Sequence, residues 1–486
     1  MKLKKLLEKL EYSVINGSDE VEVNNLIYDS RKVGKDDVFV CITGAVSDGH
    51  AYIPEVVKKG AKAVIVSKTV ENCAEYGDVT FIQTRDTRLA LAYMSAAFFD
   101  YPSKKLTTIG ITGTKGKTTT TFMIRDILEK CSIKTGLIGT IETIIGDTHI
   151  QSANTTPESY KVQEYFSEMV KCGCRCVVME VSSQALMLHR TAGINFDIGV
   201  FTNLEPDHIG PNEHADFEEY MACKGLLFKQ CKHGIVNIDN EHTKDVLKGH
   251  TCTLETYGIK KEADMKASNI IYRHEGGHIS TEYDITGKCS MNVKLTLPGE
   301  FSVYNSLCAI AVARHFNVDA KLLKTALYET KVAGRVEPVR VSDDFIVMID
   351  YAHNAMSLKS LLETLREYNP GRIVALFGCG GNRSKLRRFE MGEVSGNMAD
   401  FTIITSDNPR FEEPEEIMND IETGIKKTSG KYIKIVDRAE AVKYAIDNAK
   451  PGDIIILAGK GHEDYQEIKG VKYHQTDREL IERAVR

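Results

Sequence analysis

The sequence contains no stretch of 18 apolar residues, so we expect no segment that crosses a membrane as a helix. We expect no signal peptide either, because lysines interrupt the helically spaced Leu3, Leu6, Leu7 and Leu10. Neither sign of charge dominates, since 62 Lys and Arg face 68 Asp and Glu, and this argues against a nucleic-acid partner. We therefore expect a cytoplasmic protein, without a nucleic-acid partner and without membrane insertion. We also expect a monomer.

Cysteine is too sparse for a disulfide scaffold, with twelve residues in a chain of 486. Cys172, Cys174 and Cys176 alternate directly before the apolar run 177–179. Three thiols could bind a metal ion, but no second pair of Cys or His lies near them in the sequence. The pattern favours reduced, structural thiols at the start of a strand, and metal binding is the alternative.

The length suggests about three domains. Strand-like and helical segments alternate along the chain, which predicts α/β domains with parallel sheets covered on both faces. The strand pattern restarts after residues 101–105 and breaks again near residues 331–335, so we place domains at 1–101, 102–331 and 332–486. The second break is a candidate hinge.

Four apolar runs in the last third each end in a polar cluster. The runs are 345–350, 372–378, 401–406 and 453–459, and the clusters are 350–354, 380–383, 406–410 and 459–463. In an open parallel sheet the carboxyl ends of the strands share one edge, where ligands bind. Taken alone, Arg410 reads as a surface arginine on a capped loop. Four clusters on one edge instead favour a ligand site that contains it.

A glycine-rich segment between the predicted strand 106–112 and a predicted helix matches a phosphate loop. The segment is Gly113, Thr114, Lys115, Gly116, Lys117, Thr118 and Thr119. Backbone N–H groups and the helix N-terminus suit phosphate oxygens, Lys117 suits the β- and γ-phosphates of ATP, and Thr118 suits Mg²⁺. Ile111 stands where the full pattern has glycine, so this is a shortened variant, and a glycine-rich turn with a surface lysine is the alternative. The sequence thus predicts a central P-loop parallel-sheet ATPase domain, followed by a Rossmann-like domain.

Residues after two further strands are candidate metal ligands. Glu180 ends one predicted strand, and Asp207 with His208 follows another. Carboxylates are hard oxygen ligands suited to Mg²⁺, whereas histidine is less usual, so a structural role for His208 is the alternative. Lys224, judged by its local sequence alone, reads as a solvated lysine on a helix.

The order of these motifs resembles the Mur ligase family of ATP-dependent ligases in cell-wall synthesis. The segments that carry the resemblance are DSR (29–31), DGH (48–50), GTKGKTT (113–119), MEVSS (179–183), the TNL..DH stretch (202–208), LPGEFSVYNSLCAIA (297–311), VAGRVE (332–337), DYAH (350–353), GCGGNR (378–383), DNPR (407–410) and AGKGHED (458–464). They span nearly the whole chain, and their combination is far more specific than any one of them.

The resemblance implies a role for each domain. Residues 1–101 would hold the uridine diphosphate end of a UDP-muramoyl-dipeptide, with Ser30 among the contacts, and the central domain would bind ATP and Mg²⁺. The muramoyl-peptide would contact Asn154, Thr155, Thr156, Ser182 and Arg190. Asn305, Asp350 and His353 match positions near the nucleotide or the hinge. Lys117, Lys224 and His208 would be catalytic, and the metal would be held by Thr118, Glu180, His208 and Lys224 as a carbamate.

The resemblance also implies the second substrate. The amino-acid contacts would be Arg388, Asp407, Asn408, Pro409, Arg410, Gly459 and Glu463. A guanidinium grips a carboxylate with two hydrogen bonds, so Arg410 would select meso-diaminopimelate, whereas L-lysine has no distal carboxylate. The implied reaction joins this amino acid to UDP-N-acetylmuramoyl-L-alanyl-D-glutamate through an acyl-phosphate.

Three alternatives stay open at this point. The same reaction could use another amino acid such as L-lysine, or the chain could be a ligase like folylpolyglutamate synthetase, which would not need the first-domain motifs or DNPR. A non-catalytic nucleotide-gated scaffold is the third, and the retention of four residues argues against it, namely Lys117, Glu180, His208 and Lys224. Departures from the family pattern at Leu188, at 205–206 and at Asn354 bear on the peptide acceptor more than on the chemistry.

Overall fold

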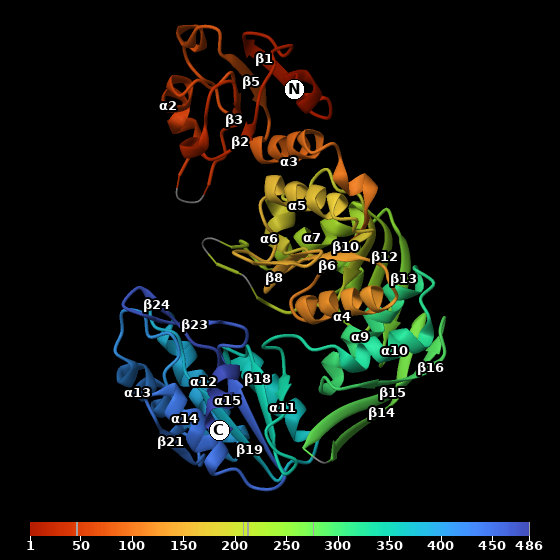
Figure 1. Ribbon diagram of the computed structural model, residues 1–486, viewed down its shortest axis with the longest axis vertical. Helices are drawn as coiled ribbons and strands as arrows, with labels where there is room; N and C mark the ends of the chain where they lie inside the picture. The colour runs from red at the N-terminus through yellow and green to blue at the C-terminus, as the bar shows by residue number, and fades with distance from the viewer. Residues whose placement is uncertain (45–46, 208, 211–212, 276, 486) are drawn as a thin grey trace. The chain divides into compact units, whose positions relative to one another are not determined.

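The computed structural model describes residues 1–44, 47–207, 209–210, 213–275 and 277–485. The chain divides into two compact units, one of residues 1–257 and 308–318 and the other of residues 258–307 and 319–486. Figure 1 traces the chain through its helices and strands. None of the helices in the described ranges is long and apolar enough to cross a membrane.

The first hundred residues form a small five-stranded sheet in the order β1-β5-β4-β3-β2. Its strands are β1 (Tyr12–Asn16), β2 (Leu26–Ile27), β3 (Val38–Val40), β4 (Ala63–Val66) and β5 (Thr80–Thr84), and its helices are α1 (Leu3–Leu7), α2 (Ile53–Lys58) and α3 (Thr87–Phe98). All neighbours are parallel except β1 with β5. The helical spacing at the N-terminus is confirmed, since α1 buries Leu3, Leu6 and Leu7 in the core of this sheet.

A larger sheet carries the phosphate loop. Within the first unit its strand order is β13-β12-β11-β6-β10-β7-β8-β9. The strands are β6 (Thr107–Thr112), β7 (Thr135–Ile138), β8 (Glu142–Ile145), β9 (Thr148–Gln151), β10 (Cys176–Glu180), β11 (Phe196–Phe201), β12 (Cys231–Asn237) and β13 (Thr253–Gly258). From β13 to β7 all neighbours are parallel, whereas β8 and β9 are antiparallel additions. The carboxyl ends of β10 and β11 therefore flank that of β6, which leads into the loop.

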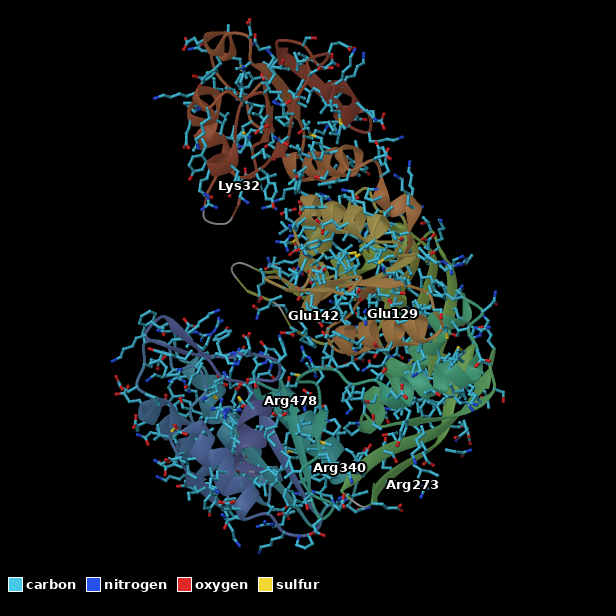
Figure 2. All side chains as sticks on the ribbon, viewed as in Figure 1. Lys32, Glu129, Glu142, Arg273, Arg340 and Arg478 are labelled. Carbon is cyan, nitrogen blue, oxygen red and sulfur yellow. The ribbon has the colours of Figure 1, made fainter. Side chains whose placement is uncertain are left out.

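Helices cover both faces of this sheet, as predicted. They are α4 (Lys117–Lys130), α5 (Ser159–Lys171), α6 (Ser183–Met187), α7 (Phe217–Gly225) and α8 (Thr243–Val246). α4 lies on one face and α5 on the other, where α5 packs into a core with residues of β10 and β11 (Figure 1). At the far end of α4 from the loop, Glu129 accepts a 2.6 Å hydrogen bond from the backbone N–H of Thr135 (Figure 2).

An antiparallel meander opens the second unit. Its strands are β14 (Met265–Glu275), β15 (His278–Gly287) and β16 (Met291–Leu295). Two helices follow, α9 (Gly299–Arg314), which begins in the second unit and ends in the first, and α10 (Ala320–Glu329).

The last third forms a six-stranded sheet in the order β17-β18-β22-β19-β20-β21. The strands are β17 (Glu337–Val339), β18 (Ile346–Asp350), β19 (Arg372–Phe377), β20 (Phe401–Ile404), β21 (Tyr432–Lys434) and β22 (Asp453–Ala458). Only β17 is antiparallel, and Glu337 in it pairs with Arg478 (Figure 2). The four predicted apolar strands are confirmed as β18, β19, β20 and β22, neighbours in one parallel sheet.

Helices again cover both faces, and a hairpin follows the last strand of the sheet. The helices are α11 (Ala355–Arg366), α12 (Lys385–Met398), α13 (Pro414–Ile425), α14 (Arg438–Asp447) and α15 (Asp477–Val485), and the hairpin strands are β23 (Tyr465–Ile468) and β24 (Val471–His474). α11, α12 and α13 share one apolar core, whereas α14 and α15 share the core on the opposite face. This arrangement leaves the carboxyl edge of the sheet to loops.

Candidate functional site

The phosphate loop joins β6 to α4 in a conformation that requires glycine. Gly113 has φ +151°, and a Cβ there would lie 1.9 Å from Thr202 Oγ1. Gly116 has φ +84° and immediately precedes the first residue of α4, Lys117. The Lys117 ammonium folds back over the loop and donates to the carbonyls of Gly113 at 2.8 Å and Thr114 at 3.1 Å. The loop therefore presents a helix N-terminus and a lysine at one point, as an anion site requires.

Residues after β11 fix the loop from the side. The Asn203 carboxamide accepts from the Lys115 backbone N–H at 2.8 Å and donates to the Lys115 carbonyl at 3.0 Å. The Lys115 ammonium pairs with the Glu205 carboxylate at 2.6 Å. Glu205 is one of the positions named above as departures from the family pattern, and here it pairs with the first lysine of the loop.

Glu180 lies at the end of β10, almost fully buried beside the loop. Its carboxylate accepts hydrogen bonds from the Thr118 hydroxyl at 3.1 Å, the Thr140 backbone N–H at 2.8 Å and the Thr140 hydroxyl at 3.0 Å. A carboxylate and a hydroxyl in contact form a hard oxygen donor set that fits Mg²⁺. In the described part of the chain no three His, Cys, Asp or Glu side chains gather as a metal cluster, and Mg²⁺ commonly takes its other ligands from phosphates and water. His208 lies outside the described residues.

Lys224 is not the solvated lysine that its local sequence suggests. Its side chain, on α7, is only 1% exposed, and its amine donates to the Gly113 carbonyl at 3.0 Å and lies 4.2 Å from the centre of the Tyr220 ring. Burial, followed by repulsion from Lys117, holds the pKa of Lys224 well below its ordinary value. The interpretation as a surface lysine is wrong because tertiary packing, not the helix pattern, decides its burial.

The predicted muramoyl-peptide residues converge on one cavity of about 130 Å³. It is lined by Asn154, Thr155, Thr156, Ser182 and Arg190, together with Ser183, Gln184, Glu213 and His214. Arg190 donates to the Thr156 carbonyl at 3.0 Å, and the Thr156 hydroxyl donates to the Glu180 carbonyl at 2.9 Å. The cavity is thus hydrogen-bonded to the end of β10, the strand that carries Glu180. Ser30 lies apart from it, on a 3-10 turn of the first sheet, Ser30–Lys32.

His214 is a member of this cavity that sequence reasoning missed. Its ring is fully buried, and Nε2 lies 2.8 Å from the Ser183 hydroxyl. Nothing in the local sequence distinguishes it from other histidines, because its partner is 31 residues away.

The polar clusters of the last third meet, as predicted, at the carboxyl edge of the third sheet. They line a cavity of about 250 Å³. Of the predicted residues it contains His353, Arg388, Asp407, Asn408, Arg410, Gly459 and Glu463, and it adds Tyr351, Gly378, Cys379, Gly380, Arg383, Ser384 and Arg387. Pro409 is not among the lining side chains. The mixture of guanidinium and carboxylate groups suits a ligand that carries both signs of charge.

The charged residues of this cavity differ in how far they are already paired. Arg388 is 1% exposed and forms ion pairs with Glu412 at 2.8 Å and Asp420 at 2.9 Å. Arg410 donates to Glu467 at 3.1 Å and to the Gly381 carbonyl at 2.7 Å. We infer that Arg388 mainly shapes the wall, since two carboxylates balance its charge, whereas Arg410 lines the cavity with a single carboxylate partner.

Glu463 and Asp407 provide the negative side of the cavity. The Glu463 carboxylate accepts from the Asn408 amide at 2.7 Å. Burial, and then the nearby Asp407, raises the pKa of Glu463. An arriving ammonium group would therefore be attracted by two carboxylates, one of which is held in place by the loop that contains Arg410.

Asp350 and His353 follow β18. The Asp350 carboxylate accepts backbone hydrogen bonds from Val336 and Ala352, both at 2.8 Å, and burial raises its pKa. It thus ties the candidate hinge to the sheet. His353 Nδ1 lies 2.9 Å from the Tyr351 carbonyl, and burial lowers the pKa of His353. Asn305 lies buried within α9.

The three thiols flagged in the sequence lie between α5 and β10. Cys176 begins β10 and is buried, as predicted for a strand residue, and the sulfurs of Cys172 and Cys174 are 3.5 Å apart. All three are free cysteines. They lie at the amino end of β10, whereas Glu180 lies at its carboxyl end.

Known domain families match the chain in three consecutive segments. The Mur ligase family, catalytic domain, matches residues 22–99, the Mur ligase middle domain matches residues 111–313, and the Mur ligase, glutamate ligase domain, matches residues 334–461. The chain belongs to the Mur ligase family, and the resemblance seen in its motifs is confirmed. It is an ATP-dependent ligase that forms amide bonds.

Relatives with nearly the same length have one name in common. UDP-N-acetylmuramoyl-L-alanyl-D-glutamate–2,6-diaminopimelate ligase of Caldanaerobacter subterraneus subsp. tengcongensis is 44% identical, with 99% of this chain and 98% of that protein covered. The enzyme of the same name from Clostridium tetani is 40% identical, with coverage of 100% and 99%. A solved structure of an enzyme with this name superposes with a TM-score of 0.74 at 27% identity, with coverage of 100% and 98%.

A folylpolyglutamate synthase of Mycobacterium tuberculosis shares only the fold, with a TM-score of 0.59 at 16% identity over 77% of this chain and 92% of that one. The predicted fold class is therefore confirmed, and the folate alternative gains no support beyond it.

Proposed function

We propose that this enzyme joins meso-diaminopimelate to the D-glutamyl carboxylate of UDP-N-acetylmuramoyl-L-alanyl-D-glutamate, with release of ADP and phosphate. The observation that carries the amino-acid assignment is the cavity at the edge of the third sheet, where Arg410 faces a space shared with Asp407 and Glu463. Diaminopimelate offers a carboxylate and an ammonium group at its far end, and such a cavity complements both. Full-length relatives that carry this substrate in their name support the same choice.

We assign ATP to the phosphate loop. The Lys117 and Lys115 ammonium groups would stabilise the charge that develops on the γ-phosphoryl group during its transfer to the D-glutamyl carboxylate. The amine of the second substrate then attacks the acyl-phosphate and displaces phosphate. Thr118 and Glu180 would hold Mg²⁺, which supplies additional positive charge at the phosphates when bound.

Lys224 would supply an anion to the same site after carbamylation. A neutral amine can attack CO₂ and lose one proton to become a carbamate, and the depressed pKa of Lys224 favours the neutral amine. That His208 is a further Mg²⁺ ligand stays a prediction.

The proposal also assigns a different substrate to each domain. Residues 1–101 would bind the uridine diphosphate end through Ser30, residues 102–331 would bind ATP and the muramoyl-peptide, and residues 332–486 would bind the amino acid. Asn305, Asp350 and His353 would lie at the nucleotide or the hinge. That the chain is a cytoplasmic monomer stays a prediction.

An ADP-release assay with matched substrates tests the proposal. The purified chain receives ATP, Mg²⁺ and the UDP-linked dipeptide, with meso-diaminopimelate, L-lysine or no amino acid, and a parallel reaction contains a folate acceptor with glutamate. We expect ADP release to require the dipeptide and to be fastest with meso-diaminopimelate. If ADP release is fastest with L-lysine, the second substrate is L-lysine and not meso-diaminopimelate. If ADP is released with the folate acceptor, the proposed reaction is wrong. The Lys117→Ala variant controls for contaminating ATPases.

A further inference from the structure

We propose that the β23–β24 hairpin is a specificity element and that Glu467 in it is the residue that positions Arg410 for the distal carboxylate of the amino acid. This inference rests on the proposed function, in which Arg410 recognises that carboxylate. The hairpin lies outside the loops that end the parallel strands, and none of its residues was among the predicted contacts.

The hairpin first fixes the backbone of the loop that carries Arg410. The Arg410 N–H donates to the Glu467 carbonyl at 2.9 Å, and the Lys469 N–H donates to the Arg410 carbonyl at 2.6 Å, so that Arg410 and Ile468 form a parallel bridge. Arg410 adopts φ +52°, in the left-handed region, which is unfavourable for an arginine. Such a conformation persists only where its surroundings hold it, and the hairpin supplies that restraint.

Hairpin side chains and N–H groups then hold the neighbours of Arg410. The Glu467 N–H donates to the Asn408 side-chain oxygen at 2.9 Å, and the Gln466 amide donates to the Asp407 carbonyl at 2.9 Å. Consecutive residues of β23 therefore contact three of the four residues in the 407–410 segment. The buried Lys460 ammonium connects the two sides, since it donates to the Asn408 side-chain oxygen at 3.4 Å and to the Tyr465 carbonyl.

The Arg410 guanidinium is oriented by two acceptors on different sides. Nε donates to Glu467 Oε2 at 3.1 Å, and Nη1 donates to the Gly381 carbonyl at 2.7 Å. Each Nη carries two hydrogens, so these two bonds fix the plane of the group and still leave N–H groups for a carboxylate in the cavity. A Cβ added to Gly380 would lie 3.1 Å from Nη1, so a side chain at position 380 would make the guanidinium shift by a few tenths of an ångström.

This arrangement predicts how amino acids are distinguished. Glu467 engages Nε and thereby directs an incoming carboxylate to the Nη atoms. A guanidinium held in that orientation strengthens the binding of meso-diaminopimelate through its distal carboxylate. It does not strengthen the binding of L-lysine, which has no distal carboxylate. Disturbance of Glu467 should therefore change the preference between the two amino acids more than it changes the reaction itself.

The test compares Glu467→Ala, Glu467→Gln and Gly380→Ala with wild type and with Tyr473→Ala, an exposed position on β24. For each we measure kcat and KM with meso-diaminopimelate and L-lysine, KM for ATP and the UDP-linked dipeptide, and Tm. We expect Glu467→Ala to lower the preference for meso-diaminopimelate by at least about tenfold through its KM, with the other KM values within about twofold. Glu467→Gln should retain most of the preference, because its amide oxygen can still accept from Nε. Tyr473→Ala should behave as wild type.

Gly380→Ala keeps the test decisive if Glu467→Ala does not fold, because it displaces Nη1 without altering the hairpin. It should lower the same preference. If wild type does not use meso-diaminopimelate, the proposed function fails. If wild type uses it and folded Glu467→Ala keeps the wild-type preference, the proposed function stands and the role of Glu467 is refuted. If Gly380→Ala keeps that preference, the selection does not depend on the orientation of Arg410, and the role proposed for Glu467 falls with it.

Discussion

Replacement of Lys224 by methionine should make the protein more stable and inactive. The amine is buried and donates to one carbonyl, that of Gly113, at 3.0 Å. Methionine keeps the unbranched shape and removes the cost of burying an incompletely solvated polar group, which is roughly 1–3 kcal/mol. We therefore expect the free energy of unfolding to rise by about that amount near neutral pH. Turnover should fall at least about a hundredfold, because the site loses the group that would become a carbamate.

The gain in stability should depend on pH with a definite sign. The folded pKa of Lys224 lies below the ordinary value of 10.5 because of burial and Lys117. Between these two pKa values the unfolded chain binds a proton that the folded chain does not, so this group makes wild-type stability rise with pH by up to about 1.4 kcal/mol per pH unit. The part of the destabilisation that comes from the lowered pKa is largest below the folded pKa of Lys224 and disappears as the pH approaches 10.5. The advantage of Lys224→Met should shrink over that window.

Denaturant unfolding of both proteins in CO₂-free buffer, from about pH 6.5 to about pH 9.5, measures this difference. Added bicarbonate should alter the stability of wild type and leave Lys224→Met unchanged, since only a lysine can form the carbamate. A Lys224→Met protein that is less stable than wild type near neutral pH, or an advantage that does not vary with pH, would refute the account of a buried amine with a lowered pKa.

Three further substitutions test the other assignments. Lys117→Ala should reduce ATP turnover at least about a hundredfold at unchanged Tm, because it removes the charge at the phosphates, and normal turnover by folded protein would contradict the loop assignment. Arg410→Ala should raise the KM for meso-diaminopimelate at least about 30-fold, since loss of a buried charge pair costs roughly 2–5 kcal/mol. Arg410→Lys should not restore the wild-type KM fully. An unchanged saturation curve for Arg410→Ala would mean that Arg410 does not contact the amino acid. Glu180→Gln should increase the Mg²⁺ concentration needed for half-maximal turnover by about tenfold or more, and an unchanged titration would remove Glu180 from the metal site.

Much of the fold could be predicted because it depends on local pattern. Continuous apolar runs flanked by polar residues mark buried parallel strands, and the runs 345–350, 372–378, 401–406 and 453–459 became β18, β19, β20 and β22. The polar residues that follow them had to share an edge once the strands were parallel, so the cavity there was predictable too. The phosphate loop was equally clear, because its glycines are required by backbone geometry at Gly113 and Gly116.

The sequence by itself therefore determined the class of the sheets, the place of the phosphate loop, and which strand ends carry polar side chains, because spacing and backbone restraints are properties of neighbouring residues. The tertiary structure alone decided which charges are buried and what pairs with them. Lys224 lies against Gly113, 111 residues away, and Arg410 is held by Glu467, 57 residues away. Burial and ion pairing depend on contacts between distant segments, and these contacts set both the pKa of Lys224 and the orientation of Arg410.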